Sequence, residues 1–551
     1  MRTVRHRPLT DVVPWPADVA QRYRDRGVWQ GVSLGEAFDR SVAAHADRVA
    51  VVDGERRITY RELGRLVDRV ARHLAAREIA DGERAIFQLP NVLEFVVAYF
   101  ACLRTGAIPV TCLPAHRHAE IGYLAKFTEA RAWFVADRFR GFDYLAMAND
   151  LRPDLPDLTD VFVAGERAAS GTTNLREMLA TGDGDAAGGL EVAPRDAREV
   201  AVFQLSGGTT GLPKVIPRTH DDYRYNSLVF AEATSFDETS VLLVSVPIAH
   251  NFPLACPGVQ GALLLGARVV LAASPDPDLV FPLIERERVT WIPAVPASVI
   301  AWLNHPRRGD YDLSSIRTLA VGGSRLNPEP ARATLRAFGP VLMQVFGMAE
   351  GLLCATRSND PEAVVVETQG RPASAEDEVR VVDDDGADVA PGQVGELLCR
   401  GPYTIRGYYR ADDHNRVAFT SDGFYRTGDM VRRHPSGNLV VEGRKKDLIN
   451  RGGEKINAEE VENLILAHPA VVNVAVVAIP DPVMGERACA FVVPRPGATL
   501  TLPELAQFLV ENRRVAKFKV PERLELRDRL PMTAVGKISK KDLREEAKTL
   551  P

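Results

Sequence analysis

Short apolar runs of strand length alternate with amphipathic stretches of helix length over the first part of the chain. Residues 49–52, 85–89 and 107–110 form apolar runs. Between the first two, apolar side chains recur at the spacing of one helix face, at Leu63, Leu66, Val67, Val70 and Leu74. Thr59 and Glu62, just ahead of that stretch, have the spacing of a helix capping box. The alternation of strand and helix predicts an α/β fold with parallel sheets.

The pattern changes near residue 376. Three short strand-like runs are separated by Asp-Gly, Pro-Gly and Ser-Gly turn signals, and they lie at residues 378–382, 395–400 and 438–442. They predict a small β subdomain over about 376–442.

Beyond residue 445, helix and strand patterns mix again. We expect helices from about Ala458 and after Leu502, with strands at 471–479 and 488–493. The chain is therefore predicted to form a large domain over residues 1–445 and a small one over residues 446–551. Roughly the first 40 residues are expected to be an arm that wraps onto something larger.

Composition restricts the possible function classes. Of 551 residues, 46% are hydrophobic and 26% charged, with a net charge of −5, which excludes a mainly disordered chain and argues against a nucleic-acid partner. The six cysteines form no Cys-x-x-Cys pair, which argues against a zinc ribbon and favours a reducing cytoplasm. We expect no membrane partner, because the sequence has no signal core and no apolar stretch of roughly 18 residues. The small-residue segment 181–189 is expected to be a surface linker.

A glycine- and hydroxyl-rich segment follows the apolar run at 200–205. It comprises Ser206, Gly207, Gly208, Thr209, Thr210, Gly211 and Lys214. Small residues let backbone N–H groups approach phosphate oxygens, while the hydroxyls and the lysine add donors and charge. The sequence matches neither a Walker loop nor a GxGxxG dinucleotide motif. The segment predicts a phosphate-binding loop, and an ordinary glycine turn is the less favoured alternative.

This segment, SGGTTGLPK, resembles the signature of the adenylate-forming enzymes, which include acyl-CoA synthetases, peptide-synthetase adenylation domains and luciferases. Further motifs of that superfamily follow in the same order, at residues 345–350, 425–429, 443–447, 450–455 and 536–537. The resemblance covers essentially the whole chain and implies ATP and Mg²⁺ as cofactors. It also implies two α/β sheet subdomains and a β-barrel-like subdomain in the large domain, followed by a mobile α+β C-terminal domain.

The resemblance gives each motif a role. Glu350 matches the catalytic magnesium ligand, Asp429 the carboxylate that binds the ribose hydroxyls, and Arg444 the arginine that contacts ribose and phosphate. Positions around the nucleotide are matched by Gly323, Val345, Phe346, Gly347 and Val441. Without the resemblance, such residues would more often be surface, turn or core positions.

Lys537 matches the catalytic lysine. Its side chain would neutralise the charge that builds as a carboxylate attacks the α-phosphate, whereas on its own it would be taken for a solvated charge. Lys446 matches the hinge about which the C-terminal domain turns between two half-reactions. Gly452 and Gly453 match a segment presented for thioester formation, and Gly453 matches the glycine beside the pantetheine tunnel, where a side chain would block the arm.

Residues 250–258, HNFPLACPG, resemble a motif of stand-alone aryl-acid-activating enzymes from siderophore biosynthesis. Those enzymes adenylate salicylate or 2,3-dihydroxybenzoate and load it onto the phosphopantetheine of an aryl carrier protein. His250 would face the phosphates as a catalytic residue, and Asn251 would donate a hydrogen bond to an ortho hydroxyl. A His-Asn pair in a loop is otherwise usually a capped turn. The resemblance implies an acid-binding pocket formed by Asn251, Phe252, Cys256, Gly322, Ser324, Gly347, Met348 and Leu353.

Two positions favour salicylate as the acid. In the subfamily, Ser at the position of Cys256 accompanies a 3-hydroxyl group, and Val at the position of Leu353 leaves it room. Cysteine is a weak donor and leucine fills more space. Cys354 and Ala355 depart from the usual pair, which keeps 2,3-dihydroxybenzoate and a substituted acid such as 6-methylsalicylate open as alternatives. An aryl-CoA ligase and an inactive paralogue that acts as a binding scaffold are the competing functions.

Overall fold

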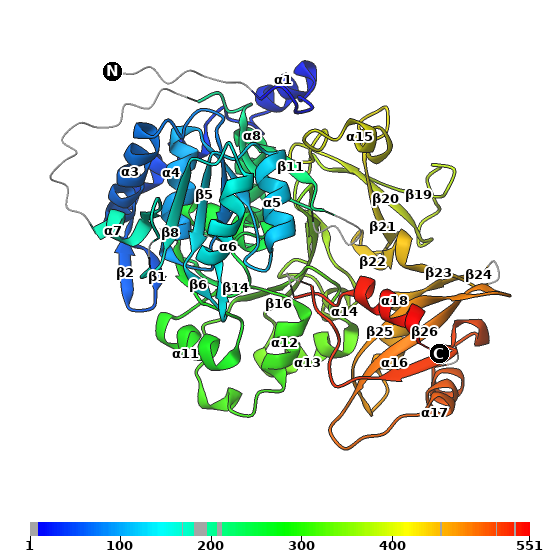
Figure 1. Cartoon of the computed structure of the whole chain (residues 1–551). Helices are drawn as coiled ribbons and strands as arrows, with labels where there is room; N and C mark the ends of the chain where they lie inside the picture. Colours follow the sequence, from blue (N-terminus) through cyan, green and yellow to red (C-terminus); the bar gives the residue numbers. More distant parts are fainter. Residues whose placement is uncertain are drawn as a thin grey trace.

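The computed structural model describes residues 9–167, 169–180, 195–206, 212–451, 454–513, 515–533 and 536–550 (Figure 1). Helices and strands alternate along most of this length, so the predicted α/β class is confirmed. Over the described ranges, the four larger sheets have nine, seven, four and five strands. The expected linker at 181–189 lies outside the described residues.

The nine-stranded sheet runs in the order β18-β17-β16-β15-β14-β12-β13-β1-β2. Its strands are β1 (Val49–Asp53), β2 (Arg56–Thr59), β12 (Val241–Val244), β13 (Arg268–Leu271), β14 (Trp291–Ala294), β15 (Thr318–Val321), β16 (Leu342–Met348), β17 (Gly351–Ala355) and β18 (Arg371–Pro372). The central strands pair in parallel, as predicted. Short turns join β1 to β2 and β16 to β17, so these pairs are antiparallel.

The seven-stranded sheet runs in the order β11-β10-β4-β3-β5-β8-β9. Its strands are β3 (Arg84–Gln88), β4 (Ile108–Thr111), β5 (Ala132–Ala136), β8 (Asp160–Ala164), β9 (Thr173–Asn174), β10 (Val200–Leu205) and β11 (Val215–Thr219). Its pairs are parallel except for β10–β11, the antiparallel edge hairpin that encloses the predicted phosphate segment. A separate two-stranded ribbon pairs β6 (Arg138–Phe139) with β7 (Phe142–Asp143).

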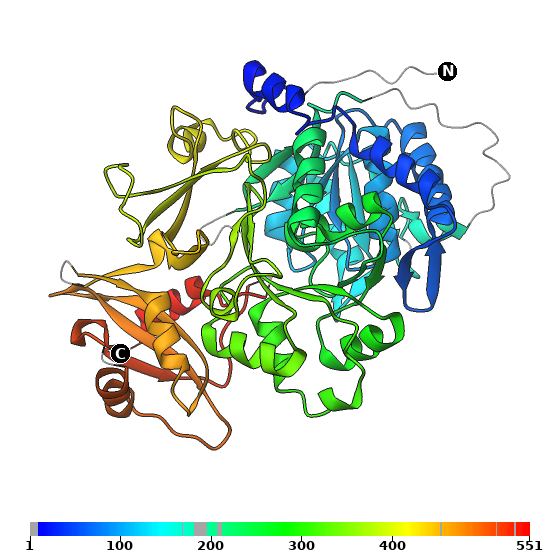
Figure 2. The ribbon, with the colours of Figure 1, turned by 180° about the vertical axis from the view of Figure 1, so that it is seen from behind.

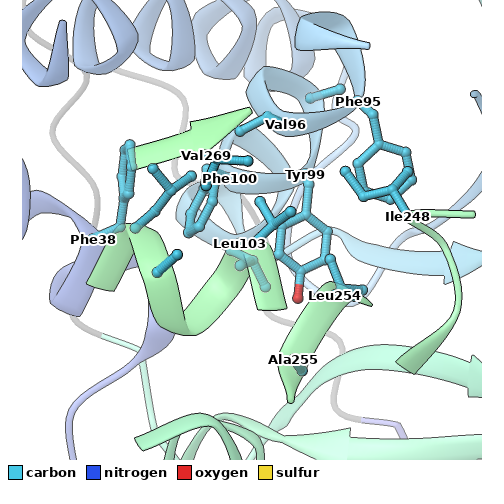
Figure 3. Packing of buried hydrophobic residues seen from close by; sticks show 14 of the residues in the cluster. Phe38, Phe95, Val96, Tyr99, Phe100, Leu103, Ile248, Leu254, Ala255 and Val269 are labelled. Carbon is cyan, nitrogen blue, oxygen red and sulfur yellow. The ribbon is translucent and has the colours of Figure 1, made fainter. Parts of the chain in front are cut away.

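Helix α4 (Leu93–Thr105) is apolar and buried almost all round, which requires protein on every side of it. Its core cluster includes residues of both large sheets. Figure 3 shows Tyr99 of α4 beside Leu254, which lies in the predicted acid-binding motif, and Leu103 of α4 belongs to the same cluster. The Tyr99 hydroxyl also donates to Gln260 Oε1 at 2.7 Å. Packing on α4 therefore fixes the segment that carries the candidate acid-binding residues.

The remaining helices before residue 450 cover these sheets or connect their strands. They are α1 (Ala17–Asp25), α2 (Leu34–Ala44), α3 (Tyr60–Ala76), α5 (His118–Phe127), α6 (Tyr144–Leu151), α7 (Leu175–Ala180), α8 (His220–Ala233), α9 (Asn251–Ala255), α10 (Gly258–Leu265), α11 (Pro277–Glu287), α12 (Pro296–Leu303), α13 (Pro328–Phe338), α14 (Glu362–Glu367) and α15 (Asp412–Ala418). The predicted capping box at the start of α3 is confirmed. Among the described helices, none has both the length and the apolar character that crossing a membrane requires.

The N-terminal segment packs onto the large domain, as expected of an arm, although its two helices were not predicted. Trp29 Nε1 donates to Pro402 O at 3.0 Å, and Arg24 pairs with Asp221 on α8 at 2.8 Å. These contacts join the start of the chain to segments about 200 and 370 residues away.

The four-stranded sheet is antiparallel and comprises β19 (Glu378–Val382), β20 (Gly395–Arg400), β21 (Tyr425–Arg433) and β22 (Leu439–Arg444). β21 was not predicted, because the polar Thr427 and Asp429 occupy buried positions that normally carry apolar residues. A short 3₁₀ turn, Lys445–Asp447, leads from this sheet into the C-terminal part. The domain division at 445/446 stays a prediction.

The five-stranded sheet comprises β23 (Leu448–Arg451), β24 (Glu454–Asn457), β25 (Val471–Asp481), β26 (Gly485–Pro494) and β27 (Arg523–Leu526). Alternate residues of β25 face two apolar clusters, one with α16 (Ala458–Leu466) and α17 (Leu502–Gln507), the other with α18 (Lys540–Thr549). Figures 1 and 2 show this orange and red part beside the green strands and the yellow sheet. The loop before α18 therefore reaches the large domain.

Candidate active site

The Lys537 side chain lies against the large domain. Its loop is held by hydrogen bonds from Lys537 N to Thr533 Oγ1 (3.1 Å) and from Thr533 N to Lys537 O (2.6 Å). Lys537 Cε lies 3.3 Å from the position that a β-carbon on Gly323 would occupy. Gly323 follows β15 with a φ of +84°, which glycine adopts without strain. A larger residue at position 323 would be strained and would crowd the lysine.

Three further charged groups act on Lys537. Asp429 Oδ1 lies 2.6 Å from Arg444 Nε, because the two residues face each other across β21 and β22. Glu350, between β16 and β17, is buried and accepts a hydrogen bond from the Tyr408 hydroxyl at 2.8 Å. Burial and the Arg444 charge lower the pKa of Lys537 to about 8, against the opposing effect of Asp429 and Glu350. Lys537 is therefore a cation at neutral pH that loses its proton in mildly alkaline solution.

Tyr408 connects Glu350 to the predicted phosphate segment. Lys214 Nζ lies 5.5 Å from the centroid of the Tyr408 ring, and the Tyr408 hydroxyl is 2.8 Å from that of Tyr425. At the base of the segment, Ser206 N donates to Lys214 O at 2.9 Å and Lys214 N donates to Ser206 Oγ at 3.0 Å. These bonds bring the two ends of the segment together and place Lys214 near the same charged centre.

His250 caps the start of α9 and lies close enough to Lys537 to feel its charge. Its Nδ1 accepts a hydrogen bond from Phe252 N at 3.2 Å. Desolvation, together with the Lys537 charge, lowers the pKa of His250 to about 3. The ring is therefore neutral at physiological pH, and because Nδ1 accepts, the proton is on Nε2. His250 thus offers a neutral N–H donor rather than a second cation.

The residues predicted to bind the acid, called the slot below, include apolar side chains that lie next to this charged centre. Phe252 Cε1 is 3.3 Å from where a β-carbon on Gly322 would lie, and Leu353 Cδ2 is 2.6 Å from the corresponding position on Gly347. A side chain at Gly347 would collide with Leu353 unless that side chain moved, and one at Gly322 would be in tight contact with Phe252. Leu353 and Ala355 alternate on one side of β17 and belong to the same apolar cluster as Phe252 and Cys256. The slot residues on this side are thus apolar, which suits contact with a flat ring.

Asn251 and Cys256 form the polar edge of this slot, and both are buried. Asn251 Nδ2 lies 3.4 Å from Cys256 Sγ, and the thiol is 3.5 Å from the main-chain oxygen of Asn251. Burial raises the pKa of the Cys256 thiol to about 12, so it is neutral. The edge of the slot therefore offers an uncharged amide and a weak thiol.

The comparisons with known proteins agree with this geometry. A family model described as AMP-binding enzyme matches residues 38–409. The chain belongs to the AMP-binding enzyme family. The model of the AMP-binding enzyme C-terminal domain matches residues 460–537, a range that ends at the lysine of the charged centre.

Relatives within the AMP-binding enzymes are similar over nearly their whole length. A Streptomyces protein named salicylyl-CoA synthase / salicylate adenylyltransferase is 50% identical over 97% of both chains. A 2,3-dihydroxybenzoate-AMP ligase of Bacillus subtilis is 48% identical over 98% of both. A Mycobacterium tuberculosis protein named salicyl-AMP ligase / salicyl-S-ArCP synthetase is 45% identical over 97% of this chain and 94% of its own.

The structure brings some of the predicted site residues together and not others. Phe346 and Met348 pack against the apolar cluster that contains Val441. Val345 belongs to the cluster on the other side of β16. Met348 was predicted to bind the acid; its side chain packs in the cluster with Val441, and its role stays a prediction. Ser324, also predicted there, is exposed.

Several predicted residues cannot be placed. Gly207 to Gly211 of the phosphate segment, and Gly452 and Gly453, lie outside the described residues, as does the side chain of Lys446. Their roles stay predictions. Sequence reasoning also missed two residues, Tyr408 and Tyr223, whose hydroxyls bind Glu350 and Asn251. No local pattern distinguishes either of them from an ordinary buried tyrosine.

The residues around Glu350 fit a nucleotide-bound magnesium ion rather than a protein-only metal centre. Over the described chain, no group of three or more His, Cys, Asp or Glu side chains is arranged to hold a metal. Mg²⁺ is commonly held by one or two carboxylates together with substrate phosphates. The buried Glu350 carboxylate, held at Oε1 by Tyr408, would be such a ligand.

Proposed function

We propose that the protein activates an aryl carboxylic acid, salicylate in the first place, with ATP. The observation that carries this proposal is the junction of the two parts of the site. An apolar slot edged by the neutral amide of Asn251 lies next to the charged centre of Lys537, Glu350 and Asp429. A flat, uncharged ring with a carboxylate at one end matches that junction. The names of the similar proteins, which act on salicylate or 2,3-dihydroxybenzoate, support the same acid class.

In the first half-reaction, a carboxylate oxygen of the acid attacks the α-phosphorus of ATP. The bond from that phosphorus to pyrophosphate breaks, which gives the aryl adenylate and pyrophosphate. Lys537 stabilises the negative charge that develops on the reacting groups, and the Nε2–H of neutral His250 adds a donor on the same side. Asp429 and Arg444 hold the ribose. Mg²⁺, bound through Glu350, would neutralise the phosphate charge.

In the second half-reaction, a phosphopantetheine thiol attacks the carbonyl carbon of the adenylate. The bond to AMP breaks, and a thioester and AMP are released. We propose an aryl carrier protein as the acceptor, because one relative is named salicyl-S-ArCP synthetase. Another is named salicylyl-CoA synthase, so free CoA is the second candidate. Comparing thioester formation on pantetheinylated carrier protein and on free CoA distinguishes them. The buried free cysteines support a reducing cytoplasm as the location.

Leu353 and Cys256 support salicylate over 2,3-dihydroxybenzoate. Both side chains line the same cluster as Phe252, so they limit space and polar contacts at one edge of the ring. Ala355, two residues beyond Leu353 on the same face of β17, leaves more room there. That feature favours 6-methylsalicylate as the second candidate acid.

The test is ATP–pyrophosphate exchange with acids of different classes. We expect exchange that depends on salicylate or a close aryl acid, and little with amino acids or fatty acids. Exchange driven by an amino acid would contradict the neutral slot. A complete absence of exchange with every acid would instead support the inactive-scaffold alternative.

A further inference from the structure

The amide of Asn251 is held in one direction by two other buried side chains. The Tyr223 hydroxyl, on α8, donates to Asn251 Oδ1 at 2.8 Å. The same hydroxyl oxygen accepts a hydrogen bond from Gln204 Nε2, on β10, at 3.0 Å. A tyrosine hydroxyl has one proton, and here that proton lies on Asn251 Oδ1. The NH₂ group of Asn251 is therefore turned away from Tyr223 and toward Cys256.

The hydrogen bonds on the other side of Cys256 are consistent with this direction. Arg218, fully buried, donates to Asn226 Oδ1 at 3.3 Å, and an arginine can only donate. The NH₂ of Asn226 then donates to Ala255 O at 2.8 Å and lies 3.9 Å from Cys256 Sγ. The thiol proton is directed at the main-chain oxygen of Asn251, which leaves the sulfur to accept from Asn251 Nδ2. The contacts with Tyr223 and with Cys256 thus both give the Asn251 NH₂ the role of a donor.

We propose that Tyr223 and Gln204 are positioning residues that present Asn251 as a hydrogen-bond donor and so select ortho-hydroxy over ortho-amino aryl acids. The proposal rests on the proposed function and specifies which acids the same site accepts. In salicylate, the ortho hydroxyl donates to the acid's own carboxylate, so its oxygen faces outward as an acceptor. In anthranilate, the amine keeps a second N–H that faces outward. That N–H would meet the N–H of Asn251, and two donors facing each other are both left unsatisfied.

The experiment measures kcat/KM in ATP–pyrophosphate exchange for salicylate, anthranilate and benzoate. We expect the wild type to prefer salicylate to anthranilate. Tyr223→Phe frees the Asn251 amide to rotate, so kcat/KM for salicylate falls about 10-fold, as loss of one hydrogen bond predicts. Benzoate has no ortho group, so its kcat/KM stays within about twofold. Gln204→Leu removes the donor to Tyr223, so it also lowers the ratio of kcat/KM for salicylate to kcat/KM for anthranilate.

The matched control is Tyr225→Phe. Tyr225 lies on the same helix, but its hydroxyl pairs with Ser374 Oγ at 2.7 Å rather than with Asn251. Loss of the Tyr225 hydroxyl should leave the ratios of kcat/KM among the three acids unchanged.

A double-mutant cycle tests whether Tyr223 acts through Asn251. In an Asn251→Ala background, adding Tyr223→Phe should cause no further loss with salicylate. An equal loss on salicylate and benzoate would overturn the proposal, because it would indicate a general packing defect. Fully additive losses of kcat/KM from Tyr223→Phe and Asn251→Ala with salicylate would also overturn the proposal. A wild type that fails to use any aryl acid would contradict the proposed function itself, which is a different result.

Discussion

Replacing Cys256 by serine should reduce the preference for salicylate over 2,3-dihydroxybenzoate. Cys256 is 1% exposed, and its thiol directs its proton at the main-chain oxygen of Asn251 and accepts from Asn251 Nδ2. A 3-hydroxyl beside it would lose its water and gain only a weak partner. An unsatisfied buried hydroxyl costs about 1–3 kcal/mol, so the wild type should prefer salicylate roughly 5- to 150-fold in kcat/KM.

A serine oxygen at position 256 accepts a hydrogen bond from the 3-hydroxyl while its own proton stays directed at Asn251 O. Cys256→Ser should therefore reduce the preference about 10-fold, and adding Leu353→Val should reduce it further by restoring space. The assay is pyrophosphate exchange with both acids. Cys354→Ser is the matched control, because that buried cysteine lies in the cluster on the opposite face of β17. A wild type that prefers the dihydroxy acid, or a ratio that Cys256→Ser leaves unchanged, would refute the reasoning.

Three further predictions concern the reaction steps. Lys537→Ala should lower kcat for adenylation by about 100-fold or more while ATP binding by calorimetry stays nearly normal; near-normal exchange would end the assignment. Because protonated Lys537 is the active form and its pKa is about 8, kcat/KM should fall above pH 8, and Lys537→Arg should remove that decline. An unchanged decline in the arginine variant would assign it to another group. Gly453→Leu should keep exchange but block thioester formation; equal loss of both steps would indicate misfolding.

The apolar pattern predicted β1, β3, β4 and β10 because these strands are largely buried and read as nearly continuous apolar runs. It missed β21 for the opposite reason. Thr427 and Asp429 occupy inward positions of that strand, and their polar side chains remove the apolar alternation. Asp429, which we propose to hold the ribose, is thus one of the residues that keep the apolar pattern from predicting β21.

The resemblance identified Lys537, Glu350, Asp429 and Arg444, and the structure places these four close enough to influence one another's charge. Their catalytic roles stay predictions. The same reasoning could not find Tyr223, which acts on a residue 28 positions away. Contacts between buried polar residues on different elements leave no mark on local periodicity. Only the three-dimensional arrangement shows which hydroxyl orients which amide.

A competition experiment tests the central claim most directly. The protein is given ATP, Mg²⁺ and an equimolar mixture of salicylate, 6-methylsalicylate, 2,3-dihydroxybenzoate, anthranilate and benzoate, and the acyl adenylates are quantified by mass spectrometry. Product ratios under competition equal the ratios of kcat/KM. We predict that salicyl adenylate exceeds the dihydroxybenzoyl and anthraniloyl adenylates. A mixture dominated by anthraniloyl or dihydroxybenzoyl adenylate would contradict the account of the Asn251 and Cys256 edge.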